Sequence, residues 1–196
     1  MAKGEDAELT GSPILTARLI LKRPDAGERA AIAALAANPR VAENLAAAPE
    51  GFSGQPRGAY VVVERGSAAV VGAAAFGPVG DRQAVAEIAS FVGEPFWGRG
   101  YATEATQALI DSLFVDDDFL VLWCANRATN TRARRVIEKC GFQFRGSGMM
   151  RSPALRVAVP VERFVLDRRN WESLKAWGAN GSSKRRQTDE PRHDAA

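Results

Sequence analysis

The sequence has few of the residues that most often carry chemistry. Its one histidine, His193, lies near the C-terminal end, and its two cysteines, Cys124 and Cys140, lie inside apolar segments. Nucleophilic sites of the Ser/His/Asp or Cys/His kind require an imidazole beside the nucleophile, and common zinc sites require clustered histidine or cysteine. We therefore expect neither kind of site, no bound metal and no disulfide framework. Any acid or base must come from other side chains.

Long hydrophobic runs are absent as well. An apolar run such as residues 68–76 is far shorter than the roughly 20 residues that a membrane-spanning helix needs. Residues 1–6 show neither the apolar stretch nor the cleavage pattern of a secretory signal. We therefore expect a cytoplasmic protein that makes no contact with a membrane.

Length and composition predict a single folded domain. The 196 residues are 46% hydrophobic and 25% charged, with a formal net charge of +3, which is ordinary for a globular protein. We predict that residues 13–177 form the domain, between a flexible segment at 1–12 and a disordered tail at 178–196. Acidic residues follow the basic run at 184–186, so a nucleic-acid partner is not expected. Both a monomer and a homodimer remain open.

Local signals predict an α+β arrangement. Asp25 and Glu28 have the spacing of a capping box, which predicts a helix that ends before Pro39. The other expected helices are at 41–47, 102–114 and 131–139, and the expected strands are at 15–23, 60–64, 68–76, 84–92, 120–125, 142–149 and 156–167. The crossover from 84–92 to 120–125 predicts a central parallel pair in a mostly antiparallel twisted sheet that helices flank in an α/β/α layering.

The loop at residues 93–105 is the strongest candidate for a binding site. It contains Gly98 and Gly100 and leads into the helix at 102–114. A helix N-terminus offers unpaired N–H groups and a positive dipole end, and glycines let a phosphate come close to the main chain. The alternative is a tight turn that needs glycine for its backbone alone. The Walker loop and the dinucleotide fingerprint are excluded, because Gly-Lys-Ser/Thr is missing and Thr103 replaces the third glycine.

Three segments together match one family. They are Leu15-Thr16-Ala17-Arg18-Leu19-Ile20-Leu21, then Ala86-Glu87-Ile88 with Phe96-Trp97-Gly98-Arg99-Gly100-Tyr101-Ala102-Thr103-Glu104-Ala105, and Asn130 with Arg135-Val136-Ile137-Glu138-Lys139-Cys140-Gly141-Phe142. With these motifs the chain resembles the GNAT superfamily of N-acetyltransferases over about residues 13–171. Within it, the chain resembles the RimJ/RimL-type branch of bacterial enzymes that acetylate the N-termini of ribosomal proteins.

The resemblance implies that acetyl-coenzyme A is the cosubstrate and that the central parallel strands splay to hold it. It implies main-chain pairing of Phe91 and Val92 with the pantetheine arm, which Asn130 holds from the other side. The expected cofactor-binding residues of the loop are Trp97, Gly98, Arg99, Gly100, Tyr101, Ala102 and Thr103, of which Gly98 to Thr103 bind the pyrophosphate. Trp97 stands where the superfamily usually has Gln or Arg. Arg135 could contact the phosphates, although arginines at a helix start also form a solvated face.

Glu87 is the candidate catalytic base, because an amine must lose a proton to attack a thioester. It resembles the glutamate that many members of the superfamily use, although a polar residue in a half-buried strand could also just face solvent. The usual proton donors to the leaving thiolate are replaced by Ala133 and Ile137. We therefore expect the thiolate to leave as an anion or to be protonated by water.

The sequence thus predicts an acetyl-coenzyme A-dependent N-acetyltransferase that transfers directly to an amine in a ternary complex. Cys140 is the one residue that would allow a covalent acetyl-enzyme instead. A protein N-terminus, a polyamine, an antibiotic and an amino acid all remain possible acceptors, with the branch resemblance favouring a peptide or protein α-amine. The alternative function is a coenzyme A-binding or ribosome-associated module with little or no turnover.

Overall fold

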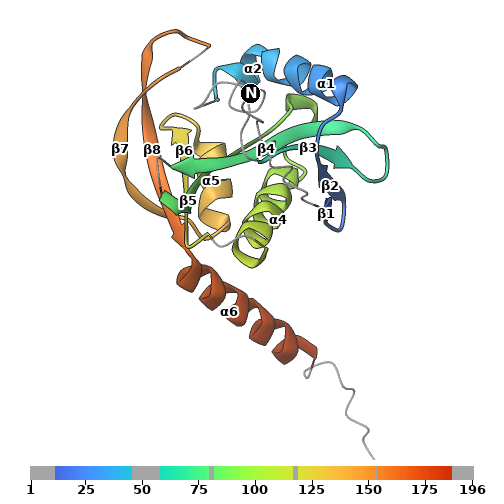
Figure 1. Ribbon diagram of the computed structural model, residues 1–196, viewed down its shortest axis with the longest axis vertical. Coiled ribbons are helices and arrows are strands. Elements are labelled where there is room, and N and C mark those ends of the chain that lie inside the picture. The colour runs from blue at the N-terminus through green and yellow to red at the C-terminus, as the bar shows by residue number, and fades with distance from the viewer. Residues whose placement is uncertain (1–11, 46–57, 80–81, 117–118, 153, 187–196) are drawn as a thin grey trace, which may run out of the picture.

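The computed structural model describes residues 12–45, 58–79, 82–116, 119–152 and 154–186 (Figure 1). Its centre is an eight-stranded sheet with the order β1-β2-β3-β4-β5-β6-β8-β7. The strands are β1 (Ile14–Leu15), β2 (Leu19–Lys22), β3 (Gly58–Glu64), β4 (Val70–Val79), β5 (Arg82–Val92), β6 (Val121–Arg127), β7 (Gln143–Arg151) and β8 (Ala158–Asp167). The pair β5 and β6 is parallel and the other pairs are antiparallel. The predicted α+β fold with one parallel pair is confirmed.

Helices cover both faces of the sheet. The helices are α1 (Ala26–Ala37), α2 (Pro39–Ala42), α4 (Tyr101–Val115), α5 (Thr131–Lys139) and α6 (Arg168–Arg186), with a short 3-10 turn η1 (Glu94–Phe96) before α4. Helices α1 and α2 lie on one face, α4 and α5 lie on the other, and α6 points away from the sheet (Figure 1). No helix in the described part of the chain is both long and apolar enough to cross a membrane.

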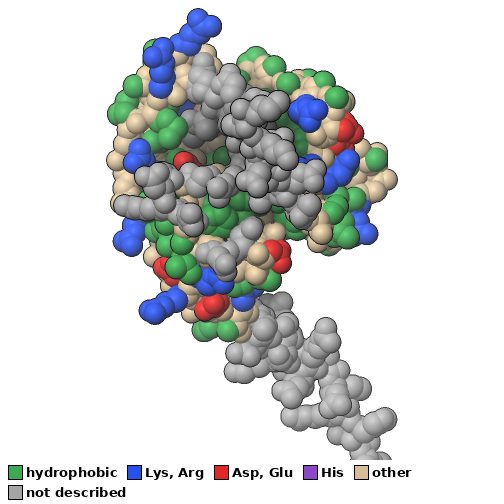
Figure 2. All heavy atoms as spheres, viewed as in Figure 1, with side chains coloured by type: hydrophobic (Ala, Val, Ile, Leu, Met, Phe, Trp, Pro, Cys, Tyr) green, Lys and Arg blue, Asp and Glu red, His purple; other side chains and the backbone are tan. Residues whose placement is uncertain are grey.

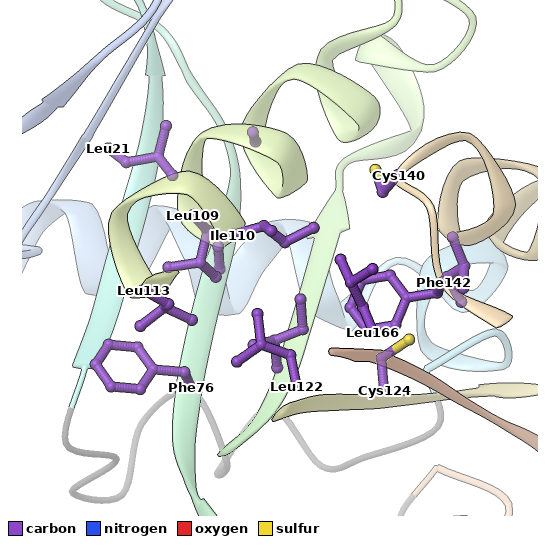
Figure 3. Close-up of a cluster of buried hydrophobic side chains, with 14 of the residues drawn as sticks. Leu21, Phe76, Leu109, Ile110, Leu113, Leu122, Cys124, Cys140, Phe142 and Leu166 are labelled. Carbon is purple, nitrogen blue, oxygen red and sulfur yellow. The ribbon is translucent and has the colours of Figure 1, made fainter. Parts of the chain in front are cut away.

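Two hydrophobic clusters hold these layers together. The larger one lies under α4, whose Leu109, Ile110 and Leu113 are at most 2% exposed (Figure 3). They face Leu122 of β6 and Phe76 of β4. The smaller cluster joins α1 to the opposite face of β3, β4 and β5. Because burial of apolar area dominates folding free energy, the sheet is anchored on both sides.

Side chains cap the N-termini of α1 and α5. Asp25 accepts from the Glu28 N–H at 2.8 Å, and Glu28 accepts from the Asp25 N–H at 3.0 Å, so the capping box of α1 is confirmed. Asn130 caps α5, which spans the predicted residues. Helix α2 begins at Pro39 and ends at Ala42 rather than spanning 41–47, and residues 46 and 47 lie outside the described residues.

Two predictions about the chain ends were wrong. The single strand at 15–23 is two strands, because the Thr16 hydroxyl accepts from the Leu19 N–H at 2.8 Å and turns the chain between β1 and β2. No helix was expected after 131–139, yet α6 follows β8 and continues past residue 178, where the tail was predicted to begin. Trp171 attaches this helix to the domain by packing against Phe114, with ring centroids 5.3 Å apart. The flexible segment at 1–12 and the tail beyond 186 lie almost wholly outside the described residues.

Candidate functional site

Strands β5 and β6 pair only briefly and then separate. Their parallel register runs from Val85 opposite Val121 to Glu87 opposite Trp123. Both strands continue past this point, β5 to Val92 and β6 to Arg127. The two strands therefore enclose a wedge, with Glu87 and Trp123 at its apex.

The register of β5 decides which main-chain groups face the wedge. The Gly93 N–H donates to the Val71 carbonyl of β4 at 2.9 Å. Hydrogen-bonding direction alternates along an antiparallel strand, so Phe91 turns its N–H and C=O toward β4, whereas Ser90 and Val92 turn theirs toward the wedge. Of the two residues predicted to pair with a pantetheine arm, the register therefore fits Val92 and not Phe91. The side chain of Phe91 instead packs in the smaller cluster.

The Trp97 side chain packs at the C-terminal end of β5. Its indole Nε1 donates to the Val92 carbonyl at 2.6 Å. Its ring lies between two guanidinium groups, with the Cζ atoms of Arg40 and Arg132 at 5.6 and 5.4 Å from the ring centroid. Since Arg40 belongs to α2 and Arg132 to α5, Trp97 links helices from opposite faces of the sheet. This role was not expected from the sequence.

We expect Trp97→Phe to destabilise the protein by about 1–3 kcal/mol, because the Val92 carbonyl loses a partly buried donor. Urea unfolding would measure the change in the free energy of unfolding. Trp177→Phe is the matched control, since Trp177 is 84% exposed on α6. Equal effects of the two substitutions would contradict a structural role for the Trp97 indole N–H.

The glycine loop has the geometry of an anion site. Gly98 and Gly100 have φ values of +78° and +80°, in the left-handed region that favours glycine. Gly100 is the N-cap of α4, and no side chain makes a capping hydrogen bond there. The first N–H groups of α4 therefore keep their capacity to bind an anion. A Cβ added at Gly98 would meet no atom within 4 Å, so the loop is open on that side.

Arg18 lies beside this loop, a neighbour that the sequence did not reveal. Its Nη1 donates to the Arg99 carbonyl at 2.9 Å, and its Nη2 is 2.6 Å from the Glu104 carboxylate. Its guanidinium also lies over the Tyr101 ring, 4.8 Å from the centroid. Arg18 therefore fixes the shape of the loop from the turn between β1 and β2. The residue falls in a segment that carries the resemblance, but its contacts span more than 80 residues of sequence.

The Tyr101 side chain makes a structural hydrogen bond to β3. Its hydroxyl donates to the Glu64 carboxylate. This hydrogen bond, together with burial, raises the pKa of Tyr101. Hydrogen bonds from Ser67 and Tyr101 hold the pKa of Glu64 below its usual range. Tyr101 can therefore contribute its main chain to a phosphate site but not a free hydroxyl.

Residues 18–143 match the family model described as "Acetyltransferase (GNAT) domain". The chain belongs to the GNAT acetyltransferase family. The predicted superfamily is confirmed, and so is acetyl-coenzyme A, which this family uses as acetyl donor. A comparison with curated proteins gave no match.

Solved structures share the GNAT fold at low sequence identity. A GNAT-family acetyltransferase from Bacillus anthracis matches with a TM-score of 0.69 and 19% identity, over 80% of this chain and 98% of that one. A Vibrio cholerae protein, for which ribosomal-protein-serine acetyltransferase activity has been suggested, matches with a TM-score of 0.64 and 20% identity, over 80% and 97%. The aminoglycoside acetyltransferase AAC(6')-Ib in complex with coenzyme A matches with a TM-score of 0.62 and 18% identity, over 80% and 99%.

Glu87 lies at the apex of the wedge, where its surroundings raise the pKa of its carboxyl. Its side chain projects from the same face as that of Phe91, which packs toward α1, because alternate residues of a strand share a face. The side chain keeps access to solvent, yet the protein around the carboxyl displaces enough water to raise its pKa. The nearby charge of Arg163 opposes this shift. Lys and Arg side chains project at several places on the viewed face of the molecule, with acidic side chains between them (Figure 2).

On the β6 side of the wedge, the Asn130 side chain is already engaged. Its Oδ1 accepts from the Ala133 N–H at 3.0 Å, and its Nδ2 donates to the Asn44 carbonyl at 3.4 Å. The Nδ2 group has a second N–H, so a hydrogen bond from Asn130 to a pantetheine arm is compatible with both contacts. Ile137 is buried, and neither it nor Ala133 can donate a proton. The Arg135 side chain is exposed and makes no hydrogen bond to another described residue, so its guanidinium stays available to a phosphate.

The cysteines do not form a reactive centre. Cys140 and Cys124 are buried in the larger cluster (Figure 3). Burial raises the pKa of Cys140 to about 12 and also raises the pKa of Cys124, so both thiols are protonated at neutral pH. The described residues also include no group of three His, Cys, Asp or Glu side chains that could hold a metal ion.

Proposed function

We propose that the chain transfers the acetyl group of acetyl-coenzyme A to a primary amine while both substrates are bound. The observation that supports this proposal is the wedge between β5 and β6, which runs from the glycine loop to Glu87. A diphosphate on the first turn of α4 would direct a pantetheine arm past the main chain of Val92 and Ser90 toward the apex. Gly98, Arg99, Gly100, Tyr101, Ala102 and Thr103 would supply the main-chain contacts.

Glu87 then acts as the base. The amine nitrogen attacks the thioester carbonyl carbon, the C–S bond breaks, and Glu87 takes the amine proton directly or through one water. The raised pKa of its carboxyl suits this step, since a stronger base holds the proton better. The released thiolate takes a proton from water, because Ala133 and Ile137 supply none. Direct transfer is favoured over a covalent acetyl-enzyme because the Cys140 thiol is buried and protonated.

We further propose that the acceptor is the α-amine of a peptide or protein, as in the RimJ/RimL-type branch. The support is the combined resemblance of residues 15–21, 86–88, 96–105, 130 and 135–142 to that branch. The activity suggested for the Vibrio cholerae neighbour agrees with this acceptor. The neighbour AAC(6')-Ib is instead an aminoglycoside acetyltransferase. Antibiotics, polyamines and free amino acids are therefore the comparison substrates in any test.

We expect thiol release from acetyl-coenzyme A to depend on an added peptide amine. A thiol-reactive dye would follow the reaction with short peptide amides, spermidine, kanamycin and free amino acids. The matched controls are the same peptides with an acetylated N-terminus, which lack a nucleophile. Tight binding of acetyl-coenzyme A without turnover of any amine would instead support a coenzyme A-binding module.

A further inference from the structure

An arginine that the proposed reaction does not use lies on the same sheet face as Glu87. Glu87 is opposite Trp123 of β6, and Trp123 is opposite Val165 of β8. Arg163 lies two residues from Val165 in β8, opposite Ala125. Alternate residues of a strand project from one face, so Glu87 and Arg163 lie on that face with β6 between them.

The Arg163 side chain is held in position without using its hydrogen-bond donors. Its Nε, Cζ and Nη2 atoms lie 3.8–3.9 Å from the place where a Cβ of Gly148 would be, so the guanidinium lies flat over this glycine of β7. The side chain is exposed, and no hydrogen bond or ion pair joins it to any other residue in the described ranges. Its charge still reaches Glu87, since it opposes the pKa shift of that carboxyl. Arg163 is therefore a cation without a hydrogen-bond or ion-pair partner among the described residues, and it lies on the same face of the sheet as the candidate base.

The cofactor phosphates do not explain this cation. The glycine loop opens α4, and α4 covers the opposite face of the sheet from Glu87 (Figure 1). In the proposed reaction, the ligand that reaches Glu87 is the acceptor amine, and Glu87 lies on the face of α1 and α2. A guanidinium is always charged and binds a carboxylate through two parallel hydrogen bonds.

We propose that Arg163 binds a carboxylate of the acceptor, so that the preferred substrates are amines with an acidic group close to the reacting nitrogen. This inference rests on the proposed function and narrows its substrate class. For a peptide acceptor, the acidic group is a Glu or Asp side chain at the first or second position. Glu87 receives the amine proton while Arg163 orients the substrate through its anion.

The test compares acceptor peptides that differ by one charge. The four peptide amides are Glu-Ala-Ala, Gln-Ala-Ala, Ala-Glu-Ala and Ala-Gln-Ala, each assayed with acetyl-coenzyme A for kcat/KM. For the native protein we expect at least one Glu peptide to exceed its Gln counterpart by about tenfold, the size of one charge-assisted hydrogen bond. In Arg163→Gln the Glu to Gln ratio should fall to about one, because the carboxylate of the Glu peptide then has no guanidinium partner. Arg163→Lys, which keeps the charge but loses the two parallel hydrogen bonds, should retain part of the preference.

Arg169→Gln is the matched control, because Arg169 is an exposed arginine on α6 and the variant has the same net charge. It should keep the native ratio. The inference is overturned if the native protein acetylates no Glu peptide, if its Glu to Gln ratio is near one, or if Arg163→Gln keeps the native ratio. Failure of the proposed function looks different, since the native protein would then release no thiol with any amine. Turnover of neutral amines without a charge preference would remove only the role of Arg163.

Discussion

Gly100→Glu is expected to lower the affinity for acetyl-coenzyme A by about 100-fold or more. The backbone at Gly100 has φ of +80°, where a residue with a Cβ costs about 1–2 kcal/mol, so the free variant would relax out of this conformation and binding would have to restore it. The new carboxylate would also repel a diphosphate at the N-terminus of α4 and could take its place on the exposed N–H groups. Each 1.4 kcal/mol is about a factor of ten in affinity, so the two effects together reach the expected loss. Isothermal titration calorimetry with acetyl-coenzyme A would measure it.

Two further variants separate the causes. Gly100→Ala introduces the backbone strain without the charge, so its affinity should lie between that of the native protein and that of Gly100→Glu. Gly66→Glu is the matched control, since a Cβ at this turn between β3 and β4 would meet no atom within 4 Å. Native affinity in Gly100→Glu, or an equal loss in Gly66→Glu, would show that the glycine loop is not the diphosphate site.

Glu87→Gln is expected to lower kcat by about 100-fold or more, the usual contribution of a general base. Affinity for acetyl-coenzyme A should stay within about twofold, because the side chain lies at the apex of the wedge and not at the glycine loop.

In the native protein, kcat/KM should fall as the pH falls through the raised pKa of Glu87, since the base then becomes protonated. The variant should lack this limb of the pH profile. Glu172→Gln, an exposed change on α6, is the control.

Glu87→Gln should raise the stability of the protein although it lowers kcat. A carboxyl whose pKa is raised by folding binds its proton more tightly in the folded state than in the unfolded state. The native protein therefore loses stability as the pH rises from the unfolded pKa of Glu87 through its raised folded value. Glu87→Gln should unfold at a higher temperature than the native protein at pH 7, with a smaller difference at pH 4. A folded variant that is fully active would remove Glu87 as the proposed base, and a variant that unfolds at a lower temperature than the native protein at pH 7 would contradict the expected gain in stability.

Much of the fold followed from local sequence. The capping box at Asp25 and Glu28 was predicted because its two residues lie three positions apart. The meander and the crossover were predicted because hydrophobic periodicity and the handedness of connections restrict the possible arrangements. Helix α6 was missed, since its attachment depends on Trp171 reaching Asp111 and Phe114 in α4. Packing between distant segments outweighed its weak local signal.

Some features of the candidate site could also be predicted from the sequence, and others required the structure. The glycine loop and Glu87 could be found from residue types and their order, because a strand, a loop and a helix follow one another directly in the chain. The orientation of Phe91 could not, because it depends on the pairing of β5 with β4. Trp97 was predicted as a cofactor residue, but its ring lies between Arg40 and Arg132, which come from two different helices.

The sequence by itself determined the family, the mostly antiparallel sheet with one parallel strand pair, and the place of the glycine loop before a helix. These depend on residue identity and short spacings, which are read directly along the chain. Only the tertiary structure decided which main-chain groups face the wedge, that Arg18 supports the loop, and that Arg163 lies beside Glu87. Those arrangements depend on strand register and on contacts between segments far apart in the chain, where a shift of one residue would turn each side chain to the other face.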